Sequence, residues 1–195
     1  GSFVALRDGR LLFAYSHFYG GAADDSPSRV ALRVSADRGL TWSGDTTLVE
    51  NTALNTMSVS FLRLESGRIA LLYLLRVRGG DERQRLDVLL RISEDEGATW
   101  SEPVRCSGTP SYYVVNNDRL VQLTSGRLVI PAADHGTFDG RRLGVGRALC
   151  FLSDDEGVTW RHGARVPVPA DFGDAHLQEP LVVERRDGRL LMLCR

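Results

Sequence analysis

Lysine is absent from this chain. All 24 of its Lys/Arg positions are arginines, and the chain also contains 25 aspartates and glutamates. The resulting formal net charge of −1 provides no general attraction to nucleic acid or to an acidic membrane surface. Because a guanidinium binds a carboxylate through two parallel N–H donors, single arginines remain candidates for ligand binding.

Cysteines are few, and long apolar runs are missing. The three cysteines, Cys106, Cys150 and Cys194, have no paired spacing, so they indicate neither a zinc site nor a disulfide framework. We expect them to be small apolar residues of the core. No apolar stretch approaches the length of a membrane-spanning helix. With 43% hydrophobic residues in 195, the chain can build a packed core, and no metal or cofactor is expected.

All three tryptophans lie in one repeated phrase, Ser-x-Asp-x-Gly-x-Thr-Trp. It reads SADRGLTW at 35–42, SEDEGATW at 93–100 and SDDEGVTW at 153–160, with spacings of 58 and 60 residues. A second phrase, typified by RDGRLLFAY from Arg7, recurs with spacings of 58, 59 and 62 residues. Its glycines are Gly9, Gly67, Gly126 and Gly188. Two phrases that share one period indicate a repeat architecture.

Each repeat carries the signals of β structure. FVALRDGRLLFAY is an apolar run, an Asp-Gly turn and a second apolar run, which is typical of a hairpin. No segment has helical periodicity. The chain therefore predicts an all-β fold, a β-propeller of four-stranded antiparallel blades, with about three and a half blades in one domain spanning 1–195. Since propellers usually close at about four to eight blades, we expect an incomplete propeller.

The repeated phrase is expected to be a structural turn. Its glycine supplies a positive φ, its aspartate accepts hydrogen bonds from the turn, and its serine and threonine fix the ends. We expect Trp42, Trp100 and Trp160 to fold back into the apolar layer and to be largely buried. The alternative, a tryptophan that stacks on a ligand, is disfavoured because the phrase recurs in every repeat.

The topology separates two ends of the blades. The Asp-Gly turns join strands one and two, and the tryptophan turns join strands three and four, so both lie at one end of an up-and-down blade. Acids, arginines, asparagines and aromatics gather in the loops of the opposite end. These loops are 16–28, 55–58, 76–85, 112–119, 133–142 and 176–180. A site for a polar, anionic or carbohydrate ligand is expected there.

The repeated phrase resembles the Asp-box, or BNR repeat, of sialidases (neuraminidases), which are six-bladed propellers. The resemblance covers the chain as roughly the first half of such a propeller. QEPLVVERRDGRLLMLCR resembles the segment that carries the family's glutamate and one arginine of its carboxylate-binding triad, which match Glu179 and Arg195. FYGGAADDSP resembles the loop that carries the acid/base aspartate, for which Asp24 is the candidate and the adjacent Asp25 the alternative.

This resemblance implies an exo-sialidase-like glycoside hydrolase that removes a terminal sialic acid, or a related acidic sugar, with retention of configuration. Arginines such as Arg195 would hold the substrate carboxylate. Sialidases use a tyrosine nucleophile, for which Glu179 would be the base. Asp24 would protonate the leaving oxygen and later activate water. No cofactor is implied, and a secreted or periplasmic location is suggested by the resemblance alone.

The sequence departs from the family pattern in several places. The first triad arginine, the nucleophilic tyrosine and the third triad arginine have no match, so we expect residues 1–195 alone not to hydrolyse a sialoside. Tyr112 and Tyr113 lie in the right region of a blade, but in the wrong blade for the nucleophile. Arg119 stands at the start of a first strand and is a substrate-binding candidate, together with Asp25, without a place in the triad.

Other interpretations stay open. A non-catalytic Asp-box propeller that binds glycan or protein would share the same fold. A glycosidase with two carboxylates would pair Asp24 with Glu179, and their separation would bear on that mechanism. Structural roles are the alternative for single residues: Glu179 could cap the entrance of a strand, and Arg195 could pair with an acid of the core.

Overall fold

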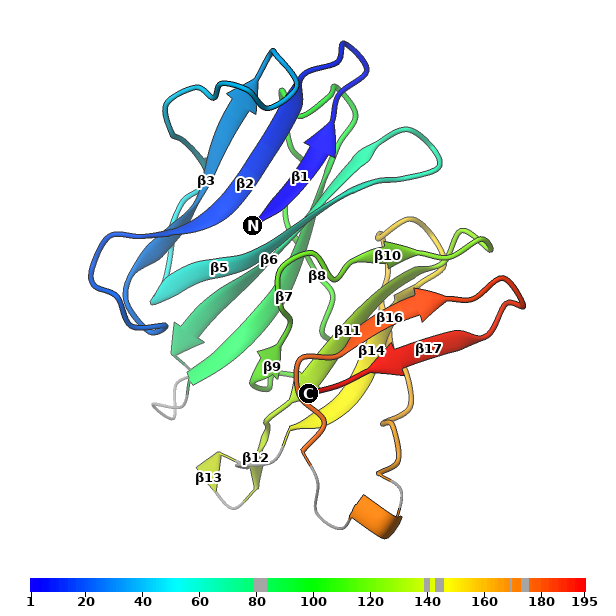
Figure 1. Ribbon diagram of the computed structural model, residues 1–195. Coiled ribbons are helices and arrows are strands. Elements are labelled where there is room, and N and C mark those ends of the chain that lie inside the picture. The colour runs from blue at the N-terminus through cyan, green and yellow to red at the C-terminus, as the bar shows by residue number, and fades with distance from the viewer. Residues whose placement is uncertain (79–83, 139–140, 143–145, 169, 173–175) are drawn as a thin grey trace.

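The first two sheets of the protein have the same topology. The computed structural model describes residues 1–195 apart from 79–83, 139–140, 143–145, 169 and 173–175 (Figure 1). Each of the two sheets has four antiparallel strands in chain order. The strands of the first blade are β1 (Ser2–Ala5), β2 (Leu11–Phe18), β3 (Ser28–Ser35) and β4 (Thr46–Val49). Those of the second are β5 (Asn55–Arg63), β6 (Ile69–Arg78), β7 (Gln84–Ser93) and β8 (Val104–Arg105).

The third blade keeps this order but interrupts its first strand. It consists of β9 (Tyr113–Val114), β10 (Val121–Gln122), β11 (Leu128–Asp134), β14 (Arg147–Ser153) and β15 (Arg161–His162). Both β9 and β10 pair with β11, at its two ends. The hairpin of β12 (Thr137–Phe138) and β13 (Arg141–Arg142) is inserted between β11 and β14. The sequence did not predict this insertion.

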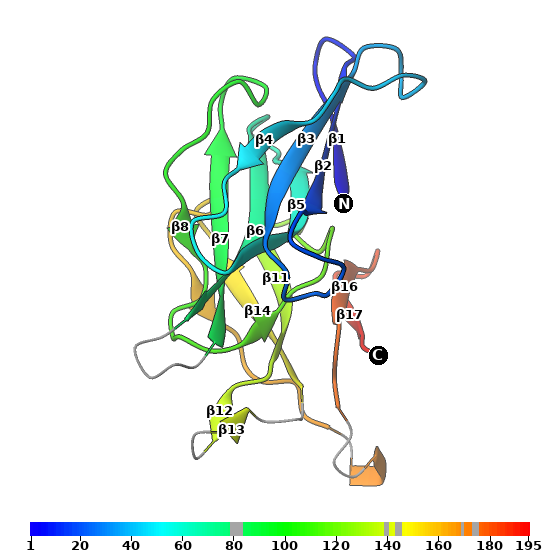
Figure 2. The same ribbon diagram turned by 90° about the vertical axis from the view of Figure 1, so that its left-hand side faces the viewer.

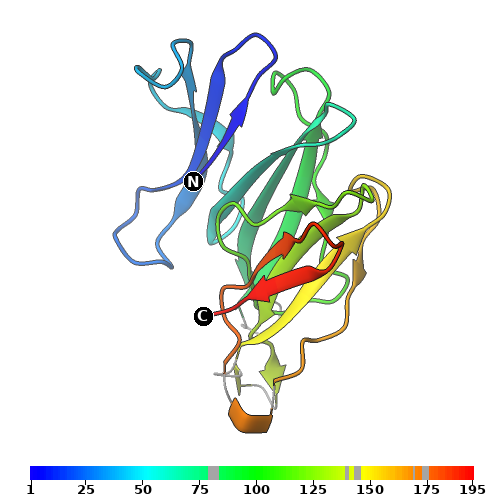
Figure 3. The same ribbon diagram turned by 45° about the vertical axis from the view of Figure 1, so that its right-hand side comes forward.

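The fourth blade is represented by one hairpin. It consists of β16 (Leu181–Glu184) and β17 (Leu190–Leu193), and a 3-10 turn, η1 (Ala170–Phe172), precedes it. Successive blades follow one another from β1–β4 to β16–β17 in Figure 1, and Figure 3 brings β16 and β17 in front of β11 and β14. Figure 2 places the β12–β13 hairpin and η1 at the same end of the molecule. The predicted propeller of four-stranded blades is confirmed.

The core lies between neighbouring blades, because the strands of the second blade are apolar on both faces. Alternate residues of β6 enter two different clusters. Ile69, Leu71 and Tyr73 pack towards the first blade. Ala70, Leu72 and Leu74 pack towards the third. The unbroken run IALLYLL is therefore a strand buried on both sides, and its fully buried leucines, Leu71, Leu72 and Leu74, contribute roughly 1.5–3 kcal/mol each by burial.

The repeated turns have the hydrogen bonds that their sequence predicts. In the second turn the Asp95 carboxylate accepts from the Ser93 hydroxyl at 2.9 Å, the Thr99 N–H at 2.8 Å and the Thr99 hydroxyl at 2.6 Å. Gly97 has φ 86°, and the preceding Glu96 also has a positive φ of 60°. The other two turns repeat both the bonds and the pair of positive φ angles.

The tryptophans are less buried than expected. Trp100 packs on the cluster between the first two blades, where its ring lies 6.0 Å from that of Phe61, and Trp160 packs on the next cluster. Trp42 contacts Phe3 and Phe13. All three are only partly buried, because each indole covers the end of an apolar layer and does not enter it. The indole N–H groups of Trp42 and Trp160 donate to the glycine carbonyl of their own turn, at 3.1 and 3.0 Å.

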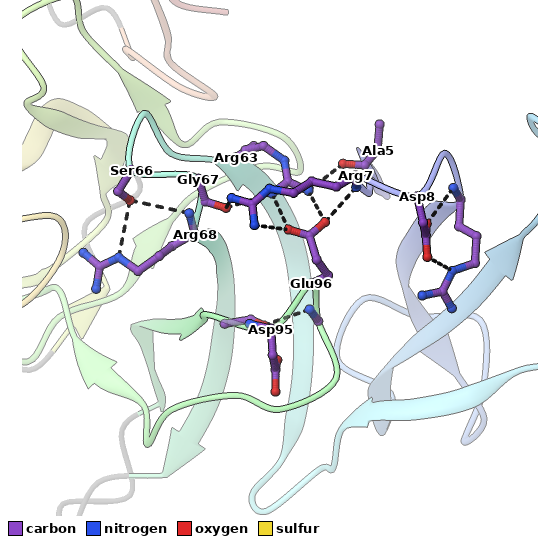
Figure 4. A network of polar contacts seen from close by, with 12 residues as sticks. Ala5, Arg7, Asp8, Arg63, Ser66, Gly67, Arg68, Asp95 and Glu96 are labelled. Atoms are coloured by element: carbon purple, nitrogen blue, oxygen red, sulfur yellow. Dashed lines mark hydrogen bonds and ion pairs between the residues drawn. The ribbon is translucent and has the colours of Figure 1, made fainter.

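One end of the blades collects all these turns, and we call it the turn rim. It comprises the hairpin turns 6–10, 64–68, 123–127 and 185–189 and the Asp-box turns 35–42, 93–100 and 153–160. Neighbouring blades are tied together here, as Figure 4 shows for Glu96. Its carboxylate accepts from the Arg7 N–H and from the Arg63 guanidinium, each at 2.8 Å. Arg68 forms the next such link with Glu156.

Candidate functional site

A cleft of about 660 Å³ opens at the end of the blades opposite the turn rim. The strand register requires this separation: Leu11 pairs with Ser35 near the turns, and Phe18, which lines the cleft, pairs with Ser28 at the other end. The predicted separation of the two ends is confirmed. Two loops assigned to this end, 76–85 and 133–142, lie partly outside the described residues.

Among the described residues, three carboxylic acids line the cleft: Asp24, Asp25 and Glu179. Two of them come from the first blade and one from the fourth, so the fold brings together candidates that are about 155 residues apart in the sequence. The neutral polar residues of the lining are Ser16, Ser58, Gln84, Asn116 and Asn117. Its apolar residues are Phe18, Met57, Leu74, Leu86 and Val114. A polar cleft with apolar patches suits a sugar, which has both hydroxyl groups and C–H faces.

The loop that carries Asp24 and Asp25 is held by the second blade. The Asn55 side chain, fully buried at the start of β5, donates to the Asp24 carbonyl at 2.9 Å and to the Ser26 carbonyl at 3.3 Å. The Tyr19 N–H donates to the Pro27 carbonyl at 3.1 Å and closes the loop. A buried amide with two carbonyl acceptors fixes the loop backbone, so both carboxylates leave it from defined positions.

Glu179 owes its position to a recurring feature of the first strands. It has a positive φ of 50° and stands nine residues before the turn glycine Gly188. Ser58 (φ 56°) stands nine residues before Gly67 in the second blade, and Asp118 (φ 59°) stands eight before Gly126 in the third. In the second blade this place is a β-bulge, since two residues stand between Met57 and Ser60 where the partner strand has one. The recurrence makes the unusual φ an architectural device, which directs Ser58 and Glu179 alike into the cleft.

Arg195 lies beside Glu179. Its guanidinium approaches the Glu179 carboxylate to 3.0 Å, and the backbones of Arg195 and Gln178 exchange two hydrogen bonds. The Arg195 side chain is 72% exposed and that of Glu179 is 33% exposed. The acid partner of Arg195 is therefore Glu179, which lines the cleft, and not an acid of the core.

Arg119 does not belong to the lining of the cleft. Its backbone N–H donates to the Ser60 hydroxyl at 2.9 Å, and its guanidinium donates to the Asn117 carbonyl at 3.1 Å. Tyr113 is also turned away, because it is buried and its hydroxyl lies 3.0 Å from that of Thr109. Burial raises the pKa of Tyr113. The role of Arg119 in substrate binding stays a prediction.

Two residues lie in loops that the sequence assigned to the cleft end, but neither was named as a site candidate. Arg76, near the end of β6, lines the cleft although its residue is only 6% exposed, and its guanidinium donates to the Tyr112 hydroxyl at 3.0 Å. Asn55 stands opposite Arg76 in the β5–β6 register and anchors the Asp24 loop. The alternation of side chains along a strand could have identified Arg76. Leu72, Leu74 and Arg76 lie on one face of β6, so Arg76 follows two apolar residues on the face that packs in the core.

Neither a metal centre nor a membrane helix emerges from the described residues. Among them, no three potential metal-ligating side chains of His, Cys, Asp or Glu come together. None of the helical residues of the described chain forms a helix long and apolar enough to cross a membrane.

Comparison with known proteins places these features in context. Residues 9–195 match the model of the BNR repeat-like domain. A sialidase of Paraclostridium sordellii is 26% identical over 218 residues, a match that covers all of this chain and 51% of the relative. The chain thus spans about half the length of that relative.

Solved structures agree on the fold. A protein of unknown function from Dyadobacter fermentans superposes with a TM-score of 0.79 at 18% identity, over 100% of this chain and 60% of that one. The Trypanosoma rangeli sialidase, solved as a covalent intermediate with 2,3-difluorosialic acid, gives 0.72 at 18% identity, over 100% of this chain and 33% of that one. At such identities the likeness concerns the fold.

Proposed function

The chain belongs to the family of BNR repeat-like domains, and we propose that the polypeptide containing it is an exo-sialidase-like glycoside hydrolase. Its substrate would be a glycoconjugate that ends in sialic acid or a related acidic sugar. The observation that carries the proposal is the convergence of Asp24, Asp25 and Glu179 on one cleft, with Arg195 paired to Glu179. The sialidase relative and the sialidase fold support the same reaction class.

The roles follow from the chemistry of an acidic sugar. A sialic acid carries its carboxylate on the anomeric carbon, so a carboxylate nucleophile would be repelled and a neutral tyrosine is favoured. Glu179 would take the proton of that tyrosine, for which residues 1–195 hold no match. Asp24, or its neighbour Asp25, would donate a proton to the leaving oxygen and then accept one from the attacking water. The tyrosine would displace the leaving group from one face of the anomeric carbon, and water would then displace the tyrosine from the opposite face. These two inversions together retain the configuration of the sugar.

Arg195 would serve the substrate carboxylate. Its guanidinium is exposed beside Glu179, which lines the cleft, and it keeps donors free beyond the single contact with Glu179 among the described residues. An incoming carboxylate would compete with Glu179 for this cation. Binding of the substrate carboxylate to Arg195 would then release Glu179 from the ion pair. The Glu179 carboxylate would become available as a base when the substrate is bound.

The test is turnover of a fluorogenic sialoside by the full-length protein. Glu179→Gln removes the base and is expected to lower kcat about 10²- to 10⁴-fold. Glu184→Gln is the matched control: Glu184 is five positions further along the same hairpin and accepts from Thr124 on the turn rim, at 2.8 Å. It should keep the turnover of the wild type. NMR of the first product formed should find the retained anomer.

Two outcomes would contradict the proposal. Binding of sialosides without turnover by the wild type would identify a glycan-binding propeller. Turnover that Glu179→Gln leaves unchanged would place the base elsewhere.

A further inference from the structure

Arg76 is a cation at an unusual place in the second blade. It continues the inward face of β6 after Ala70, Leu72 and Leu74, all of which lie in the core between the second and third blades. Strand parity therefore directs its side chain inward, and the end of the strand brings it to the cleft. With 6% exposure it is among the most buried charged residues described. An arginine is almost never buried to this degree without a partner for its charge.

Among the described residues, the Arg76 guanidinium has one neutral partner and no anionic one. Its Nη2 donates to the Tyr112 hydroxyl at 3.0 Å, and its Cζ lies 5.8 Å from the centre of the Tyr112 ring. Its Nε is buried and has no hydrogen-bond partner among the described residues. Within the described part of the chain, no carboxylate lies within ion-pair distance of Arg76.

Two other arginines of the same sheet are neutralised by acids. Arg63 pairs with Glu96 at 2.8 Å, and Arg105 pairs with Asp87 at 2.9 Å. Arg195, the other cation near the cleft, is paired with Glu179 and largely exposed. Arg76 thus lines the cleft with a positive charge that no acid among the described residues compensates. Burial of such a charge costs free energy.

We propose that Arg76 binds the carboxylate of an acidic sugar inside the cleft, as a buried contact in addition to Arg195. This rests on the proposed function and extends it by one ligand-binding residue. The carboxylates of Asp24, Asp25 and Glu179 line the cleft and would repel an anionic sugar, and a cation inside the same cleft would offset this repulsion. Burial strengthens the contact, because water competes little with the ligand at a buried guanidinium.

The experiment measures whether Arg76 distinguishes an acid from its ester. Full-length protein is titrated calorimetrically with N-acetylneuraminic acid, its methyl ester and glucuronic acid. We expect Arg76→Gln to weaken binding of an acid about tenfold or more and to leave binding of the ester within about threefold. Arg76→Lys keeps the charge without the planar fork and should lie between the two.

A matched control stands on the neighbouring strand. Arg91 on β7 donates to the Tyr73 hydroxyl at 3.4 Å, so it is another arginine–tyrosine pair of the same sheet, and it does not line the cleft. Arg91→Gln should leave every affinity unchanged. The thermal transition of Arg76→Gln shows whether this variant folds. If it does not fold, the ratio of the affinities for acid and ester is compared between Arg76→Lys and the wild type, and a lower ratio in Arg76→Lys supports the role of Arg76.

The outcomes separate this inference from the proposed function. Equal affinity of the wild type for acid and ester, or an unchanged preference in Arg76→Gln, would overturn the role of Arg76 even if sialosides are hydrolysed. A preference for glucuronic acid over N-acetylneuraminic acid that is lost in Arg76→Gln would support Arg76 and count against a sialidase.

Discussion

The two ends of the blades differ in how far the protein satisfies their polar side chains, although the Trp100 indole N–H at the turn rim is also buried without a hydrogen-bond partner among the described residues. At the turn rim, Asp37, Asp95 and Asp155 each accept from a serine hydroxyl, a threonine N–H and a threonine hydroxyl of their own turn. At the cleft end, Asn55 Oδ1 and Arg76 Nε belong to residues paired in register across β5 and β6, and both atoms are buried without a hydrogen-bond partner among the described residues.

This difference separates architecture from function. A carboxylate that its own turn satisfies contributes to the fold, and this arrangement recurs in the first three blades. A buried group that the protein leaves unsatisfied costs about 1–3 kcal/mol, which a ligand can recover by supplying the partner. We therefore expect substitutions at the turn rim to change stability with little effect on turnover, and substitutions in the cleft to do the reverse.

The largest effect should come from the aspartate that acts as acid and base. Asp24→Asn in the full-length protein is expected to lower sialoside kcat about 10²- to 10⁴-fold with little change in thermal midpoint, because both side chains have similar size. Asp25→Asn is the matched variant, since both acids line the cleft on one anchored loop. A larger loss in Asp25→Asn than in Asp24→Asn would reassign the role to Asp25.

The next effect lies at the turn rim and concerns stability. Gly157 has φ 90°, and a Cβ built on it would overlap Leu90, which is 1% exposed. Gly157→Ala therefore adds a steric clash to backbone strain, and should lower the free energy of unfolding by about 2–5 kcal/mol. Gly126 has φ 85° but nothing within 4 Å of such a Cβ, so Gly126→Ala should cost only about 1–3 kcal/mol.

Denaturant titration of both glycine variants measures the difference. Turnover per folded molecule should match the wild type in each. Equal losses of stability would mean that Leu90 moves aside at no cost. A selective loss of turnover in Gly157→Ala would break the separation of the two ends.

A smaller effect is expected at the mouth of the cleft. Arg195→Lys keeps a positive charge near Glu179 but loses the planar pair of donors, so kcat/KM for a sialoside should fall roughly 10- to 150-fold. Arg185→Lys is the control, because Arg185 lies on the turn-rim side of the same hairpin and pairs with Asp187. A drop in thermal midpoint with normal turnover would instead identify Arg195 as a structural ion-pair partner of Glu179.

Local rules made the fold predictable from the sequence. The blade count, the turn bonds of Asp95 and the separation of the two ends depend on residues close in the chain and on strand topology. The link from Glu96 to Arg7 and Arg63 was not predicted, because it depends on how neighbouring blades pack. The alternation of side chains along β6 puts Arg76 on the inward face of that strand. A charged residue at a strand end is ordinarily solvated, however, so nothing in the sequence alone indicated that Arg76 is buried.

The smallest expected effect is the response of the turn rim to acid. Hydrogen bonds from the Thr99 hydroxyl and N–H, and then from the Ser93 hydroxyl, lower the pKa of Asp95 from 3.8 to about 2. The same contacts act on Asp37, and the Arg63 guanidinium lowers the pKa of Glu96 from 4.5 to about 2. A pKa that is lower in the folded state means that the unfolded state binds protons first. The stabilisation is therefore complete above about pH 4.5 and is lost as the pH falls towards about 2.

Asp95→Asn tests this because it removes one of the titrating groups. The variant should melt below the wild type at pH 7, since an amide cannot accept all the bonds that the carboxylate accepts. The gap in thermal midpoint should narrow between about pH 4.5 and 2, where the wild type also loses its carboxylate. Thermal scans at half-unit intervals of pH measure it. A gap that stays constant down to about pH 2 would mean that protonation of Asp95 costs the fold nothing, and the turn rim would then owe its stability to backbone geometry and to the links between blades.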